Sequence, residues 1–133
     1  MAFKVEESLD TNIILRIALK DVPRQCEKIM DLFMRQNVVY HVADLAITEA
    51  VYVLQKNNSR QDVVDMLAQV LDLPNLKYNQ ALFDRVFLTY LQYPKLSFND
   101  CCLAGYAALN ESEPLWTFDQ ALAKESGTAK LLG

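Results

Sequence analysis

Apolar residues recur at helical spacing in several segments of the chain. In segment 23–37, PRQCEKIMDLFMRQN, they stand three and four positions apart, at Cys26, Ile29, Met30, Phe33 and Met34. This spacing predicts an amphipathic helix, and the proline at its start suits a first helical turn. Comparable patterns predict further helices over 11–21, 44–57, 59–73, 80–94, 97–112 and 119–126.

Short runs rich in β-branched and aromatic residues separate these helices. VVYHVA (38–43) has the composition and length of a strand. Further strands are expected at VEESL (5–9), LKYN (76–79), PLWTF (114–118) and TAKLL (128–132). Strands that alternate with helices through short connections favour an α/β fold, with a mostly parallel sheet covered on both faces. The 133 residues suit one domain spanning 1–133.

Composition and cysteine usage indicate the class of protein and its cellular compartment. Hydrophobic residues make up 52% and charged residues 23%, as in ordinary globular proteins. The odd set Cys26, Cys101 and Cys102 is typical of a reducing compartment, so we expect a cytoplasmic protein. No signal peptide and no run of about 18 apolar residues is visible, so no membrane association is expected.

The charge of the chain restricts its chemistry. With a net charge of −4, the chain lacks the overall positive charge that is typical of nucleic-acid-binding proteins. Binding of a nucleic acid would therefore require local basic groups or metal ions. The single histidine, His41, excludes a histidine-rich zinc site. Methionine and aromatic residues at helical spacing are expected in the core or a dimer face, and any that are exposed would mark where a helix of a partner binds: Phe33, Met34, Phe83, Phe87 and Tyr90.

Four acidic residues differ from the others, which lie on polar faces or in loops. Asp10 and Asp119 each follow an expected strand. Glu49 has apolar residues three and four positions away on both sides, so we expect it to point towards the core or a cleft. Asp100 lies in the first turn of a largely apolar helix.

Each of these acids also has a purely structural interpretation. Asp10 and Asp119 suit helix caps or turns, and Asp100 has capping-box spacing from Ser97. Taken together, however, the parallel sheet would bring all four near one rim. Four carboxylates gathered there would repel one another unless a divalent cation held them, and oxygen ligands of this kind suit Mg²⁺ or Mn²⁺.

Four segments in order carry a family resemblance: DTNIIL (10–15), ITEAVYVL (47–54), SFNDCCLAGYA (97–107) and LWTFD (115–119). They resemble the four signature segments of the PIN-domain family, and the likeness is greatest to VapC-type toxin ribonucleases. The resemblance implies a three-layer α/β/α sandwich around a mostly parallel sheet and a homodimer. It also implies metal-dependent endonucleolytic cleavage of RNA, and inhibition by a cognate antitoxin.

The resemblance also implies residue roles. Asp10, Glu49, Asp100 and Asp119 would hold Mg²⁺ or Mn²⁺, and Asn12 and Thr117 would orient these carboxylates and the attacking water. A metal-activated water would then hydrolyse the RNA phosphodiester, leaving a 5′ phosphate and a 3′ hydroxyl. From the residues alone, we name three candidates for contacts to the RNA backbone: Arg16, Lys20 and Lys56.

Other functions were weighed against the same residues. A phosphate-receiver domain needs adjacent acids after its first strand and a lysine after its last strand, and this chain has neither in the required place. A haloacid-type phosphatase needs D-x-D where this chain has D-x-N. A catalytically inactive PIN module that only binds protein or RNA stays open as the alternative, although it predicts loss of some of the four acids. One feature departs from the family: Glu6 and Glu7 lie in a first strand that is normally apolar.

Overall fold

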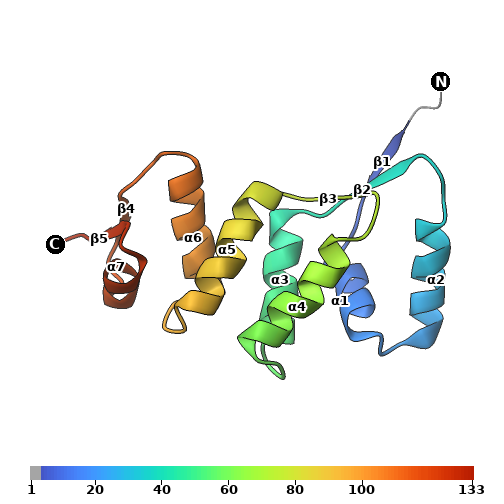
Figure 1. Ribbon diagram of the computed structural model, residues 1–133, viewed down its shortest axis with the longest axis horizontal. Coiled ribbons are helices and arrows are strands. Elements are labelled where there is room, and N and C mark those ends of the chain that lie inside the picture. The colour runs from blue at the N-terminus through green and yellow to red at the C-terminus, as the bar shows by residue number, and fades with distance from the viewer. Residues whose placement is uncertain (1–3) are drawn as a thin grey trace. The chain divides into compact units, whose positions relative to one another are not determined.

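The computed structural model describes residues 4–133 (Figure 1). The chain divides into two compact units, Met1–Tyr78 and Asn79–Gly133. Each unit is an α/β structure in its own right, and the two are described separately. Every helix and strand expected from the sequence is present, within a few residues at its ends. Among the described residues no helix is long and apolar enough to cross a membrane.

The first unit contains a three-stranded parallel sheet in the order β1-β2-β3. Four helices connect these strands, so each parallel pair is joined by helical crossovers, as parallel pairing requires. Its elements are β1 (Val5–Ser8), α1 (Thr11–Leu19), α2 (Pro23–Phe33), β2 (Val38–His41), α3 (Asp44–Leu54), α4 (Arg60–Leu71) and β3 (Leu76–Lys77).

The core of the first unit lies around β2 and the helices. Tyr40 is fully buried in β2, and its hydroxyl donates a 2.6 Å hydrogen bond to the carbonyl oxygen of Leu32. The ring of Phe33 meets Tyr40 edge-on, with centroids 4.9 Å apart. Because a buried hydroxyl without a partner is costly, this bond fixes the end of α2 against the sheet.

The acids of β1 are explained by their partners. Glu7 accepts two hydrogen bonds from the guanidinium of Arg35, at 2.8 and 3.2 Å. Glu6 lies on the other face of the strand, where its Oε1 is 2.8 Å from Nε2 of His41 on β2. The strand is largely exposed, so its acids need no burial, and the expectation of an apolar first strand does not apply to this chain.

The second unit packs two long helices beside a two-stranded parallel sheet, β4-β5. Phe98 of α6 lies among Phe83, Phe87 and Tyr90 of α5, with ring centroids 5.2–6.3 Å away. Its elements are α5 (Gln80–Gln92), α6 (Phe98–Leu109), β4 (Leu115–Thr117), α7 (Gln120–Ser126) and β5 (Ala129–Leu131).

The sheet and the apolar residues agree with the sequence-based expectations in part. The α/β class and the parallel pairing are confirmed, consistent with an α/β/α fold. The strand pairings fall into two sheets, one in each unit, where a single sheet was expected. Phe83 and Phe87 are core residues as expected, whereas Met34 is 79% exposed.

Candidate functional site

In the first unit, Thr11 connects two of the four singled-out acids. Asp10 ends the loop after β1 and caps α1, where its Oδ1 accepts a 2.7 Å hydrogen bond from the backbone N–H of Thr11. The hydroxyl of the same threonine donates a 2.7 Å hydrogen bond to Oε2 of Glu49 on α3. A single residue therefore holds both carboxylates at the C-terminal end of the sheet, where ligands of parallel α/β sheets gather.

Glu49 is exposed, so of the two expected surroundings, the core or a cleft, the core is excluded. Two of the apolar neighbours that suggested burial, Leu45 and Tyr52, are themselves 67% and 62% exposed. The buried face of α3 is formed instead by Ile47, Ala50, Val51 and Leu54, among others. Helical spacing showed which residues share a face with Glu49, but apolar side chains on that face do not by themselves indicate burial.

In the second unit, Asp100 completes a capping box at the start of α6. Ser97 accepts a 3.0 Å hydrogen bond from the backbone N–H of Asp100, and the Asp100 carboxylate accepts a 3.2 Å bond from that of Ser97. The capping-box interpretation made from the spacing is thus confirmed. It leaves the carboxylate partly exposed, with its other oxygen positions open to a cation.

Asp119 lies just after β4, as the sequence predicted, and caps α7. Its Oδ1 accepts a 3.0 Å hydrogen bond from the backbone N–H of Leu122. Its own backbone N–H donates a 2.9 Å bond to the hydroxyl of Thr117. Thr117 therefore orients Asp119 through the backbone, without touching the carboxylate.

The structure thus brings together Asp10 and Glu49 in one unit, and it places Asp100 and Asp119 at two helix starts of the other. Over residues 4–133, no three His, Cys, Asp or Glu side chains lie close enough to hold one metal ion.

The basic residues singled out earlier all lie in the first unit. Arg16 forms a 3.0 Å ion pair with Asp21, and Lys20 is the left-handed C-cap of α1. The ammonium of Lys56 lies 4.7 Å from the ring centroid of Tyr52. Of the three, Lys56 lies two positions beyond the end of α3, the helix that carries Glu49.

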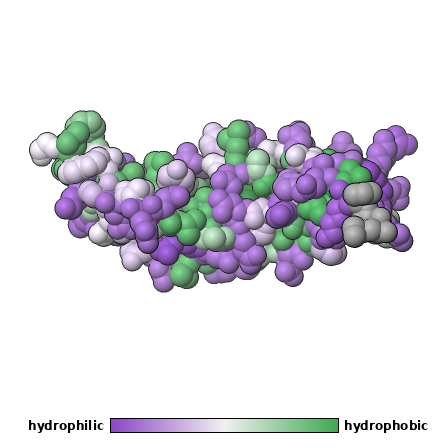
Figure 2. All heavy atoms as spheres, turned by 90° about the horizontal axis from the view of Figure 1, so that it is seen from above, coloured by the Kyte–Doolittle hydropathy of each residue, from purple (hydrophilic) through white to green (hydrophobic). Residues whose placement is uncertain are grey.

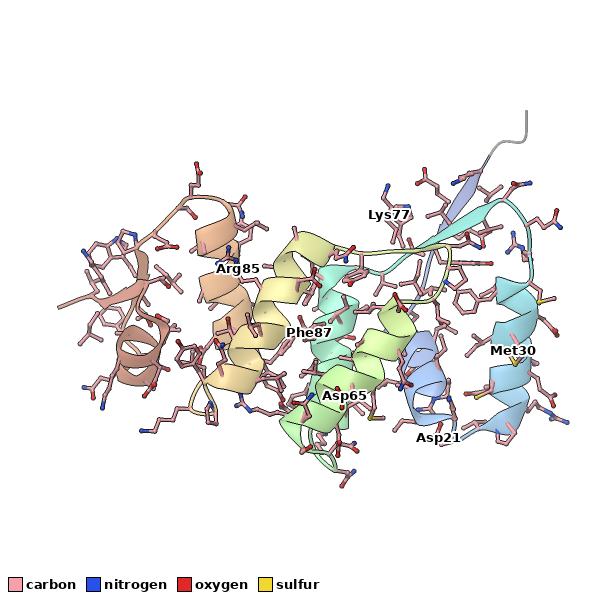
Figure 3. The ribbon with its side chains drawn as sticks, in the orientation of Figure 1. Asp21, Met30, Asp65, Lys77, Arg85 and Phe87 are labelled. Atoms are coloured by element: carbon pink, nitrogen blue, oxygen red, sulfur yellow. The ribbon has the colours of Figure 1, made fainter. Side chains whose placement is uncertain are left out.

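An apolar pocket of about 480 Å³ lies elsewhere on the first unit, between α1, α2 and the segment after α4. Met30 of α2, labelled in Figure 3, and Met34, the C-cap of that helix, both line it and are 67% and 79% exposed. Other hydrophobic side chains also reach the surface among hydrophilic ones (Figure 2). The pocket is lined by Ile17, Lys20, Pro23, Cys26, Ile29, Met30, Phe33, Met34, Leu73 and Pro74.

A comparison with family models matches the PIN domain over residues 8–126, which includes all four acids and both units. The chain belongs to the PIN-domain family. PIN domains are generally nucleases that act on nucleic acids, and the family typically uses divalent metals. A comparison with curated proteins finds no match to this chain.

One contact of this PIN domain was missed by the sequence reasoning. Asn12 was named as the residue that orients the carboxylates, but the hydroxyl that reaches Glu49 belongs to Thr11. A signal was available, because Thr11 is the first helical residue after the capping Asp10 and carries a hydroxyl. Its direction towards α3 depends on how α1 and α3 pack, which local spacing does not encode.

Proposed function

We propose that this PIN domain is a Mg²⁺- or Mn²⁺-dependent endoribonuclease. The observation that carries the proposal is the pair of hydrogen bonds from Thr11 to Asp10 and Glu49. Two carboxylates held by one residue concentrate negative charge, which a divalent cation would offset. Their hard oxygen atoms are the ligands that Mg²⁺ and Mn²⁺ prefer.

The second unit would supply the remaining ligands, Asp100 and Asp119. We propose that both units form one domain over residues 1–133 and that the four carboxylates share one site. The family match supports this because it runs across both units without a break. The fit of the donor set supports it too, since each capping bond leaves a carboxylate with acceptor positions for a cation.

Each side chain then has a defined task in hydrolysis. When bound, a divalent metal would supply an activated water and offset phosphate charge. Asp10, Glu49, Asp100 and Asp119 would hold it, Thr11 and Asn12 would orient the carboxylates of the first unit, and Thr117 would fix Asp119. The water oxygen would bond to phosphorus as the bond from phosphorus to the 3′ oxygen breaks, and one water proton would pass to that oxygen, which leaves a 5′ phosphate and a 3′ hydroxyl.

Contacts to the RNA backbone are assigned to three cations of the first unit. Lys56 follows the end of α3, the helix that carries Glu49, which supports a phosphate contact near the carboxylates. Arg16 and Lys20 lie further along α1 and are proposed for more distant phosphates. Local cations of this kind make RNA binding compatible with a net charge of −4.

A toxin role of the VapC type is the finer part of the proposal. It is supported by the four motif segments and by the apolar pocket with its exposed methionines Met30 and Met34. An amphipathic helix of an antitoxin would fill such a pocket, since its apolar lining suits that mode of recognition. Homodimerisation and a cytoplasmic location belong to the same proposal, through the resemblance and the odd number of cysteines.

Calorimetric titration with Mn²⁺ tests the shared site. Asp10→Asn in the first unit and Asp100→Asn in the second are each expected to weaken Mn²⁺ binding by at least about tenfold, because each removes a charged ligand. Asp65→Asn, on the exposed side of α4, is the matched control and should bind as wild type does. Unchanged affinity in either variant would contradict one shared site, and no Mn²⁺ binding by the wild type would favour the inactive binding module.

A further inference from the structure

An exposed stripe on α3 leads away from the Thr11-bound carboxylate. Tyr52 follows Glu49 on α3 by three positions, about 4.5 Å along the helix axis, and Lys56 lies in the turn just beyond the end of the helix. Tyr52 is 62% exposed although its ring is large and apolar. The Lys56 ammonium lies over this ring, 4.7 Å from its centroid. A flat ring and a cation are thus held together beside Glu49.

We infer that Tyr52 and Lys56 form a platform for one nucleotide of single-stranded RNA next to the cleaved phosphate. This inference rests on the proposed nuclease function and names the form of RNA that the site accepts. The base would stack on the face of the Tyr52 ring opposite Lys56. The Lys56 ammonium would contact a phosphate of the same strand.

The chemistry of the pair fits this ligand better than it fits a duplex. Single strands are bound by aromatic rings that stack on unpaired bases and by cations that follow the backbone. In a duplex the bases stack on one another, so an exposed tyrosine on a helix has no base face to meet. The ring also offers no base-specific hydrogen-bond pattern, which predicts tolerance of base identity at this position.

The neighbouring charges place the nucleotide. Glu49 lies one turn before Tyr52, so a base on the ring brings its own phosphates close to the carboxylates that the proposed metal neutralises. Lys56 offsets the charge on the far side of the ring. A nucleotide with one phosphate at each side of its sugar matches this order of groups, from Glu49 and Tyr52 on α3 to Lys56 beyond its end.

Binding measurements test the platform. The probe is a fluorescein-labelled RNA 12-mer, alone or annealed to its complement, with Ca²⁺ replacing Mg²⁺ to slow cutting, and a gel confirms that it stays intact. Fluorescence anisotropy is expected to show tighter binding of the single strand. Tyr52→Leu should weaken single-strand binding by about fivefold or more, whereas Tyr52→Phe, which keeps the ring, should bind as wild type does. Lys56→Gln should make the RNA affinity less dependent on salt concentration, because it removes one phosphate contact.

Tyr106→Leu supplies the matched control, because Tyr106 is a helical tyrosine with 60% exposure on the other unit. It should bind RNA as wild type does. Equal affinities of wild type and Tyr52→Leu, or an equal loss in Tyr106→Leu, would overturn the platform. So would a change of oligomeric state in Tyr52→Leu without a loss of RNA affinity, since the stripe would then be an interface between copies.

The outcome separates the platform from the nuclease. Mn²⁺-dependent cutting with unchanged RNA affinity in Tyr52→Leu would overturn only the platform. RNA binding that needs Tyr52, in a wild type that neither binds Mn²⁺ nor cuts RNA, would support the platform and contradict the nuclease.

Discussion

The hydroxyl of Thr11 donates a 2.7 Å hydrogen bond to Oε2 of Glu49, across 38 positions of the chain. This bond fixes the carboxylate orientation that metal binding would use. Thr11→Val keeps the shape and removes the hydroxyl, so we expect roughly tenfold weaker Mn²⁺ binding, as when other residues that orient ligands are removed. Calorimetry measures the change.

Thr48→Val is the control for this prediction. Thr48 lies next to Glu49 on α3, but its hydroxyl donates to the backbone oxygen of Asp44. The same substitution there leaves Glu49 oriented, and Mn²⁺ binding should not change. An equal loss of Mn²⁺ affinity in Thr11→Val and Thr48→Val would mean that a general effect on the helix, and not the bond to Glu49, causes the loss.

The capping role of Asp100 and its proposed metal-binding role are separable. Asparagine at 100 keeps an oxygen for the backbone N–H of Ser97, so Asp100→Asn should unfold near the wild-type temperature while losing metal binding. Ser97→Ala removes the other half of the capping box and should cost about 1 kcal/mol of stability. Thermal unfolding of both variants, without metal, checks this. A large loss of stability in Asp100→Asn would make the residue chiefly a helix cap.

The contact between His41 and Glu6 predicts a pH effect at β1. The hydrogen bond with His41 and the histidine charge lower the pKa of Glu6, and Lys77 adds a smaller effect. The stabilisation is therefore complete above the ordinary glutamate pKa and is lost as the pH falls through the lowered value. NMR titration of the Glu6 carboxyl should give a higher pKa in His41→Asn, with a smaller rise in Lys77→Gln. No rise in His41→Asn would contradict the contact.

Close helix packing in the second unit predicts a stability loss at Gly105. A Cβ atom built there would lie 3.1 Å from Cγ2 of Val86 and 3.4 Å from Cδ1 of Leu82. Val86 is fully buried and β-branched, so it has little room to move. Gly105→Val should destabilise the protein by about 1–3 kcal/mol in chemical unfolding. Ala108→Val, on the same helix but less buried, should cost less.

The elements and the family were predictable from the sequence because both are written in local patterns. The helical spacing in 23–37 and the β-branched run at 38–43 gave α2 and β2, and Ser97 with Asp100 gave the start of α6. Such signals need only neighbours along the chain. The ordered motifs around Asp10 and Asp119 identified the family in the same way.

Contacts between distant segments were not predictable. Glu49 was expected to point towards the core or a cleft because its neighbours are apolar, yet it is exposed, as are Leu45 and Tyr52. Arg35 follows Asp31 by four positions, the spacing of a helical ion pair, but it reaches across to Glu7 on β1. Such partners depend on how helices pack on the sheet, and a helical pattern specifies only which residues share a face.

RNA cleavage by wild type and by Asp100→Asn tests the central claim most directly. A mixed RNA pool is incubated with each protein in Mn²⁺ or in chelator, and the product ends are analysed. We predict cutting by wild type only in Mn²⁺, products with 5′ phosphate and 3′ hydroxyl ends, and no cutting by Asp100→Asn. Cutting that survives chelator, or that Asp100→Asn retains in full, would contradict a metal-dependent ribonuclease built on these four carboxylates.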